Sequence, residues 1–202
     1  EADENQLLQN PEMHPVRQRT IELALDFYRH FIDDRSPHPT LQADLAAAYE
    51  RVGEFSLKLG NQGESSESYQ QALRIRERLV EDNPEDLQLL LQLAEGYRDA
   101  STREPRDDQA YELMQKAIAL LEPLTSPAHR ARLADTYLML GERKTEHFAA
   151  ARNAELGDQA LTALEKSVAT WQQLIEDHPD IPDHREQLAD AYRGLCSWHA
   201  TM

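Results

Sequence analysis

One five-residue pattern, Leu-Ala-x-x-Tyr, occurs four times in this chain and restricts the folds that are open to it. The copies begin at Leu45, Leu93, Leu133 and Leu188, at intervals of 48, 40 and 55 residues. Leu and Tyr stand four apart, so they share one face of an α-helix. The small Ala that follows each Leu leaves room for a neighbouring helix to approach closely. We therefore interpret the pattern as the kernel of one structural unit used four times.

A second type of amphipathic segment precedes each kernel. Its apolar residues recur at helical spacing, as Tyr111, Met114, Ile118 and Leu121 do. We call these segments B helices and the kernel helices A helices, so that the order is B-A repeated four times. After a lead-in at 1–15, we expect one domain over 16–202. Its expected helices are 16–34, 39–60, 63–82, 84–103, 107–123, 127–150, 157–177 and 181–200.

Turn-forming and capping residues mark the expected helix junctions. Before the A helices stand Asn83 with Pro84, Ser126 with Pro127, and Asp180 with Pro182. Asn, Ser and Asp side chains accept hydrogen bonds from the first free N–H groups of a helix, and proline fits its first turn. After the A helices stand Gly60, Gly63, Pro105 and Gly157. Each B-to-A junction therefore carries a predicted start signal.

Composition and charge narrow the class of protein further. The chain has 202 residues, 40% of them hydrophobic and only seven of them glycine, so we expect an all-α fold. Its 37 acidic against 21 basic side chains leave a net charge of −16, which would repel nucleic acid and anionic membranes. No apolar run approaches the ~20 residues of a membrane helix. With its single cysteine and no signal peptide, we expect a cytoplasmic protein.

Residues 49–73 resemble a tetratricopeptide repeat (TPR). Tyr49 stands at the place of the first aromatic residue, Val52-Gly53 at that of Leu-Gly, and Leu140-Gly141 repeats the match. Tyr69 and Ala72 agree with the second helix, whereas Ser65, Ser101 and Cys196 depart from the usual small residues. The resemblance implies a right-handed α-solenoid of about eight main helices in antiparallel pairs. It also implies a protein-interaction scaffold that is not an enzyme and carries no catalytic residue, metal or cofactor.

A narrower resemblance concerns the beginning of the chain. Residues 7–34, followed by 41–54, are similar to the C-terminal TPR region of bacterial eukaryotic-like serine/threonine protein kinases. The sequence begins with Glu1 rather than Met, which we expect of a segment of a longer protein. Kinase motifs such as G-x-G-x-x-G, H-R-D and D-F-G do not occur in it. The resemblance implies the non-catalytic part of a signalling kinase.

The A helices of stacked helix pairs line a concave side, and their outward residues would face a groove. This surface is acidic with two arginines, so we expect it to bind a basic peptide, with Arg98 and Arg193 free to pair the peptide's carboxylates. An ordinary solvated surface is the alternative. The residues of the predicted groove are Glu50, Glu54, Glu95, Arg98, Asp135, Leu138, Glu142, Asp190 and Arg193.

Other features suggest competing or additional interpretations. A His/Asp loop at 177–184 would be the site of a metal-dependent enzyme, although capping of the next helix is the simpler explanation. Cys196 is expected to be a small structural residue, and Tyr97, Tyr137, Trp171 and Trp198 to be core residues. An independent structural or oligomerisation module is a further alternative. Helix 181–200 is apolar nearly all round, so either more chain follows Met202 or this end meets another molecule. We expect self-association through 181–202, most simply as a two-fold homodimer; the alternative is that the helix folds onto 157–177 and hides most of this surface within its own chain.

Overall fold

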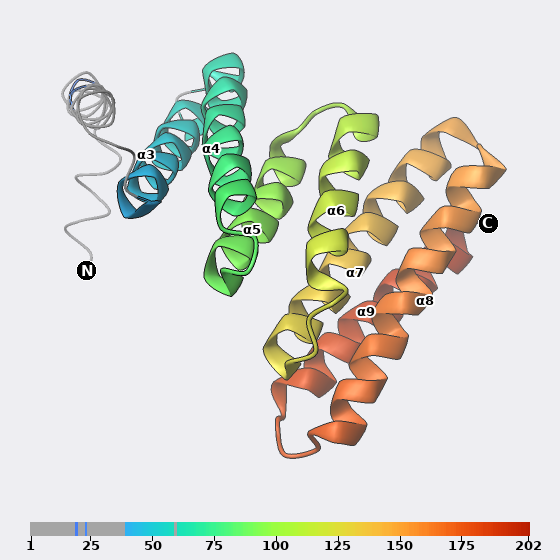
Figure 1. Ribbon diagram of the computed structural model, residues 1–202. Helices are drawn as coiled ribbons and strands as arrows, with labels where there is room; N and C mark the ends of the chain where they lie inside the picture. Colours follow the sequence, from blue (N-terminus) through green and yellow to red (C-terminus); the bar gives the residue numbers. More distant parts are fainter. Residues whose placement is uncertain (1–18, 20–22, 24–38, 59) are drawn as a thin grey trace, which may run out of the picture. The chain divides into compact units, whose positions relative to one another are not determined.

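The computed structural model describes residues 39–58 and 60–202, together with residues 19 and 23, and within these residues it contains helices and no strand. The chain divides into two compact units, one ending at Leu89 and the other beginning at Leu90, and each is described by itself. Within each unit, Figure 1 shows helices that follow one another as antiparallel neighbours. The helices are α3 (Pro39–Lys58), α4 (Gln62–Asp82), α5 (Leu87–Arg103), α6 (Asp107–Leu121), α7 (Pro127–Ala151), α8 (Ala154–Asp177) and α9 (Asp183–Thr201).

These helices confirm the predicted all-α class of TPR-like antiparallel helix pairs. Seven of the eight expected helices are present at nearly the expected bounds. The expected helix 16–34 and the lead-in 1–15 lie outside the described residues, apart from Arg19 and Leu23. The handedness of the solenoid stays a prediction.

The first unit packs α3 against α4. Its core joins Leu45, Ala46 and Tyr49 of the first kernel to Ala72 of α4. The two helices approach closely at Gly53, where a β-carbon would lie 2.7 Å from the Tyr69 ring. Gly60, at φ +81°, permits the tight link between them, because L side chains rarely adopt this backbone conformation.

The second unit packs α6, α8 and α9 around α7. One core cluster unites residues from α5, α6, α7 and α8, including Met114, Leu121, Leu133 and Tyr137. Two further clusters fix α8 and α9, one around Trp171 and the other around Trp198. The indole N–H of Trp198 donates to the carbonyl of Gly157 at 2.9 Å, so this side chain is covered within its own chain. Both tryptophans are core residues, as predicted.

Several helix junctions differ from the sequence-based prediction. Ser126 caps α7 as expected, accepting from the His129 N–H. The predicted cap at Asn83 is wrong, because its side chain donates back to the Leu79 carbonyl at the end of α4. Asp86 accepts from the backbone of Gln88 and Leu89 instead, so α5 begins three residues later than expected.

Two more junction predictions are wrong for similar reasons. Gly157 does not precede α8 but lies within it, because Asn153 caps the helix by accepting from the Glu155 N–H. Pro182, which makes no side-chain cap, stands before α9, and Asp180 is not its cap. Local capping competition therefore decides these boundaries, since the sequence offers more cap-forming residues than the helices use.

The kernel tyrosines show which copies of the pattern are packed. Tyr97 and Tyr137 are each only 6% exposed, as predicted, and Tyr49 is buried as well. The fourth, Tyr192, is 43% exposed. Cys196 is also exposed, so its prediction as a small packed residue is wrong. At the same repeat position Gly53, Ser101 and Gly141 are all buried, and the following helices place Tyr69 against Gly53 and Leu164 against Gly141.

Candidate functional site

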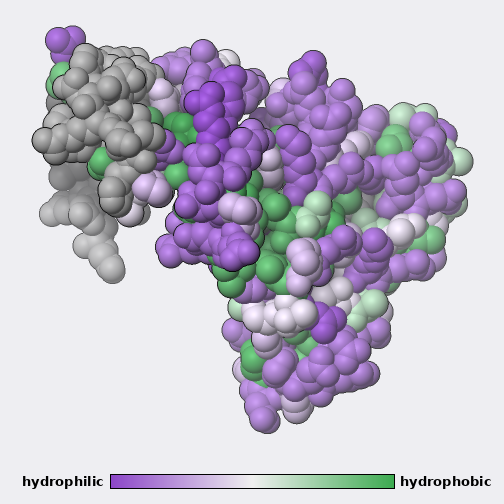
Figure 2. Space-filling model, in the orientation of Figure 1, coloured by the Kyte–Doolittle hydropathy of each residue, from purple (hydrophilic) through white to green (hydrophobic). Residues whose placement is uncertain are grey.

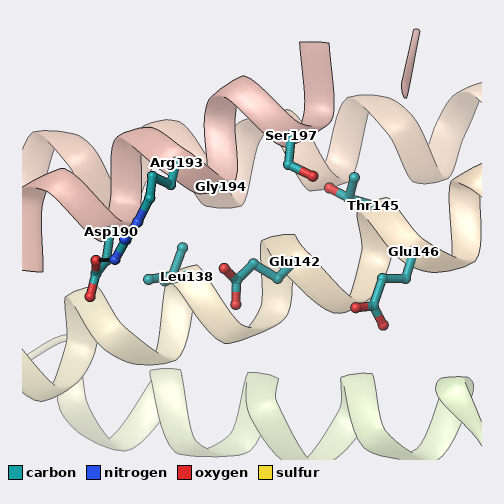
Figure 3. Close-up of a pocket in the computed structure, with 8 residues that line it drawn as sticks. All are labelled: Leu138, Glu142, Thr145, Glu146, Asp190, Arg193, Gly194 and Ser197. Atoms are coloured by element: carbon teal, nitrogen blue, oxygen red, sulfur yellow. Dashed lines mark ion pairs between the residues drawn. The ribbon is translucent and has the colours of Figure 1, made fainter. Parts of the chain in front are cut away.

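Four of the predicted groove residues, Leu138, Glu142, Asp190 and Arg193, line a cavity between α7 and α9. The cavity has a volume of about 580 Å³. Figure 3 shows Glu142 and Glu146 on α7, with Asp190, Arg193 and Ser197 opposite them on α9. Gly194 forms part of the wall, where a β-carbon would lie 2.9 Å from Leu138. The full lining is Leu138, Glu142, Thr145, Glu146, Asp190, Arg193, Gly194 and Ser197.

A second cavity lies on the other side of the same two carboxylates. Its volume is about 500 Å³, and α5, α6 and α7 line it. Glu142 and Glu146 belong to both cavities, so they form an acidic ridge between two hollows. Glu142 was among the predicted groove residues, whereas Glu146 was not. The sequence feature that could have identified Glu146 is its spacing of four residues from Glu142, which places both carboxylates on one face of α7.

Burial and repulsion by a neighbouring carboxylate make Glu142 hold its proton more tightly than a free carboxylate does. Burial is the main cause of the raised pKa of Glu142, and the nearby Glu146 raises it further, while Arg193 opposes the shift. The pKa of Asp135 is raised as well, again chiefly by burial, with Arg98 opposing and Glu95 adding to the shift. A cation entering this region would offset the cost of burying these negative charges.

Both arginines of the predicted groove contact acidic side chains of the chain itself. Arg98 donates to Glu95 at 3.4 Å and lies 3.6 Å from the Met139 sulfur. Arg193 forms an ion pair with Asp190 one helical turn earlier, as Figure 3 shows. The pairing of Arg98 and Arg193 with a peptide's carboxylates stays a prediction, and each arginine contacts a carboxylate of its own helix before any ligand binds.

The remaining predicted groove residues lie in different surroundings. Glu95 also accepts from Arg132 of α7 at 2.8 Å, which ties α5 to α7. In the first unit Glu50 is paired with Arg76 of α4 at 2.7 and 2.9 Å, so its charge is used between two helices. Glu54 is exposed on α3. Of the predicted set, the residues that the structure gathers around one cavity are Leu138, Glu142, Asp190 and Arg193.

A polar network at the start of α6 was not foreseen from the sequence. Arg143 donates to the Asp107 carboxylate and to the carbonyls of Ser101 and Glu104, which fixes the α5–α6 link. His147 lies 3.4 Å from Asp107 and 3.0 Å from the Tyr111 hydroxyl. Burial, with the nearby Asp107 charge, raises the pKa of Tyr111 to about 12. These contacts span 36 to 42 residues, so no local pattern could reveal them.

The His/Asp loop does not form a metal centre. His178 ends α8, whereas His184 is buried with its ring 5.5 Å from that of Trp171. Within residues 39–58 and 60–202, no three His, Cys, Asp or Glu side chains gather in a way that could hold a metal ion. The interpretation as a metal-dependent enzyme therefore has no site in the described residues. No helix among them is long and apolar enough to cross a membrane.

Comparison with known proteins gives likeness in structure alone. No family model matches the chain, and no curated protein sequence matches it. The structure is similar to BtubC (BKLC) from P. vanneervenii, with 20% identity, a TM-score of 0.49, and 94% of this chain and 72% of that chain covered. It is also similar to TTC0263, a thermophilic TPR protein in Thermus thermophilus, with 16% identity, a TM-score of 0.38, and coverage of 88% and 93%. MamA is similar at 15% identity and a TM-score of 0.34, with 92% of each chain covered. Likenesses at these levels assign neither a ligand nor an activity.

Proposed function

We propose that this chain is a protein-interaction scaffold whose cavity between α7 and α9 holds a cationic side chain of a peptide or protein partner. The observation that carries the proposal is the composition of this cavity. It contains Glu142, Glu146 and Asp190, and its one arginine, Arg193, is already paired with Asp190. The cavity therefore offers an excess of negative charge to a ligand.

The shape and polarity of the cavity suit lysine or arginine in particular. Their long aliphatic stems pack on apolar surface while the charged head reaches polar groups. Leu138 and the Gly194 backbone would contact the stem, and Glu142 and Glu146 would accept from the head. Hydrogen bonds between ionised groups are shorter and stronger than neutral ones. Binding a cation also removes the electrostatic cost indicated by the raised pKa of Glu142.

Charge reversal on the acidic ridge tests the proposal. The probe is a fluorescently labelled oligolysine peptide, and the measurement is its dissociation constant by anisotropy. We expect Glu142→Lys with Glu146→Lys to weaken binding by about tenfold or more, equivalent to ~1.4 kcal/mol. A scaffold of this net charge also attracts cations without a specific site, so a control with the same charge change is needed.

The matched control is Asp158→Lys with Glu165→Lys, which reverses two exposed carboxylates on α8 and leaves the cavity unchanged. The proposal expects a much smaller loss from this control than from the ridge variant. Equal losses from the two variants, with helical circular dichroism intact, would show that only the overall charge attracts the probe. The concave cavity would then not be the site.

We also propose, from the resemblance of residues 7–34 and 41–54, that the scaffold is the non-catalytic C-terminal part of a bacterial serine/threonine kinase and acts in signalling in the cytoplasm. The reading frame upstream of Glu1 tests this directly. A kinase catalytic motif set within that frame is the expected result. A start codon immediately before Glu1 would contradict the kinase context but would leave the groove proposal unaffected.

The second candidate function is a structural or oligomerisation module, with self-association through 181–202. One observation favours it: Tyr192 and Cys196 are exposed on α9, although the equivalent places in the other three kernels are buried. A light-scattering mass that rises with concentration is the expected result for this candidate. It does not compete with the groove, because Tyr192 and Cys196 do not line the cavity.

A further inference from the structure

The second cavity, which α5, α6 and α7 line, has no role in the proposed function, although it shares the acidic ridge with the first. Its volume of about 500 Å³ is close to the 580 Å³ of the cavity between α7 and α9. Both cavities are built wholly from residues of the second unit. Glu142 and Glu146 are the two residues that line both. Each side of the ridge therefore has a hollow large enough for a side chain of a partner.

The two cavities share one arrangement of charge apart from the ridge. In the first, Arg193 forms an ion pair with Asp190. In the second, Arg143 is paired with Asp107 at 2.9 Å and donates to two backbone carbonyls as well, so the chain itself uses all three nitrogen atoms of this guanidinium. His147, the remaining ionisable residue of the second lining, has its Nδ1 3.4 Å from Asp107. In each cavity a cation and an anion of the chain offset one another.

The charge that remains on both sides is that of the ridge. Within the described part of the chain, the side chains of Glu142 and Glu146 form no ion pair or hydrogen bond with another residue. Both side chains are exposed, so a partner can reach them. Their two negative charges are thus the excess charge of the two cavities together. With one cation in the first cavity, one of these charges remains for the second.

Apolar surface accompanies the ridge in the second cavity as it does in the first. Met114, Met139 and Ala150 supply it in the second, and Leu138 and Gly194 in the first. Methionine is unbranched and flexible, so its side chain adapts to aliphatic groups of different shape. Lysine and arginine carry an aliphatic stem behind a charged head. The second cavity therefore offers a cationic side chain the same two features as the first.

We propose that the partner presents two adjacent cationic residues, lysine or arginine, whose side chains enter the two cavities on either side of the acidic ridge. This inference rests on the proposed function and specifies the motif that the site recognises. In an extended chain successive side chains point to opposite sides, whereas those two residues apart point to the same side. An extended segment that lies along the ridge thus directs neighbouring residues into different cavities. Two cations also offset the repulsion between Glu142 and Glu146.

Two labelled peptides of equal charge test the motif on the unmodified full chain. In a common sequence of neutral residues, one carries Lys-Lys-Ala and the other Lys-Ala-Lys, and fluorescence anisotropy gives their dissociation constants. The buffer has low ionic strength, because salt screens exposed charges. We expect the adjacent pair to bind about fivefold more tightly, as one further ion pair would allow. Equal dissociation constants, or no measurable binding of either peptide, overturn the proposal.

Three single substitutions of exposed residues then assign the two lysines to the cavities. Thr102→Lys places a cation of the chain at the second cavity, and Ser197→Lys places one at the first. Thr162→Lys on α8 makes the same charge change outside both linings and is the matched control. The control is needed because hydrophilic residues predominate on the face drawn in Figure 2 and the chain carries a net charge of −16, which attracts cationic peptides without a specific site.

The Lys-Lys-Ala peptide should bind about fivefold more weakly to Thr102→Lys and to Ser197→Lys than to the control. If only Ser197→Lys weakens binding, the second cavity takes no cation, so this inference is wrong while the proposed function stands. If only Thr102→Lys does so, or neither variant differs from the control, the proposed function fails and this inference with it. Circular dichroism shows whether each variant keeps its helices, and the comparison of the two peptides on wild type needs no variant.

Discussion

The close contact between α7 and α8 at Gly141 gives the sharpest test of the packing. A β-carbon at this residue would lie 2.6 Å from Cγ of Leu164, 2.7 Å from its Cδ2 and 3.1 Å from its backbone nitrogen. Carbon atoms normally meet at about 3.5–4.0 Å, so the two helices would have to separate by roughly 1 Å. Leu164 is fully buried, and its backbone nitrogen, unlike a side-chain end, cannot rotate away from the added carbon. Gly141→Ala is therefore an overpacking substitution.

The expected loss of stability in Gly141→Ala is the difference between two opposed contributions. Overpacking of a tight core costs about 1–3 kcal/mol. Alanine gains back up to about 1 kcal/mol over glycine in a helix interior. The net loss in the free energy of unfolding is about 1–2 kcal/mol, and at about 2–4 °C per kcal/mol for a chain of this length the melting midpoint should fall by roughly 2–8 °C. Thermal melts followed by far-ultraviolet circular dichroism measure it.

Two other glycines serve as controls for the same substitution. Gly63 lies in the first turn of α4 with no atom within 4 Å of a β-carbon, so Gly63→Ala should be neutral or slightly stabilising. Gly60 also has open space but a φ of +81°, so Gly60→Ala should cost about 1–2 kcal/mol through backbone strain alone. A Gly141→Ala midpoint at or above that of Gly63→Ala would refute the close approach of α7 to α8.

Three further predictions follow from other parts of the second unit. Tyr137→Ala removes a buried kernel aromatic and should cost ~3–5 kcal/mol in thermal melts, so a midpoint near wild type would contradict the kernel packing. Glu142→Gln should raise the melting midpoint at neutral pH, because a carboxyl group whose pKa is raised by folding costs stability above that pKa. The midpoints of wild type and variant should converge in acid, where the carboxyl group is neutral. A difference that stays constant with pH would exclude the charge of Glu142 as its cause. Arg143→Lys replaces the planar guanidinium group, which donates to two backbone carbonyls and to Asp107. The variant should lose about 1–2 kcal/mol of the free energy of unfolding in urea. An unchanged free energy would show that this network does not stabilise the fold.

The sequence was sufficient for the helices and for most of the core. The kernel leucines and tyrosines recur at helical spacing, and packing forces such residues inward wherever a neighbour is available. Helix ends were less predictable, because Asn83 and Asp86 can both cap the N-terminus of α5, and only the folded backbone decides which of them does so. Cys196 shows the limit most clearly. The same repeat position is buried in three kernels and exposed in the fourth, so its environment depends on what covers it rather than on its own pattern.

The candidate site was predictable only in part, for a related reason. In the kernel Leu-Ala-x-x-Tyr, the second variable residue packs inward, as Thr136 and Ala191 do, which limits its size. The first variable residue escapes this constraint, and in the second unit it is acidic each time: Glu95, Asp135 and Asp190.

What distinguishes these three acids is the residue that follows three positions later. Glu95 and Asp190 each have an arginine there, Arg98 and Arg193, and both ion pairs form. Asp135 has Leu138 instead, which lines the cavity between α7 and α9. An arginine at this place could have supplied a second cation to the surrounding carboxylates, in addition to Arg193, whereas leucine supplies apolar surface. The residue that breaks the charge pattern of the repeat, Leu138, thus contributes the apolar wall of the cavity in which we propose that a cationic side chain binds.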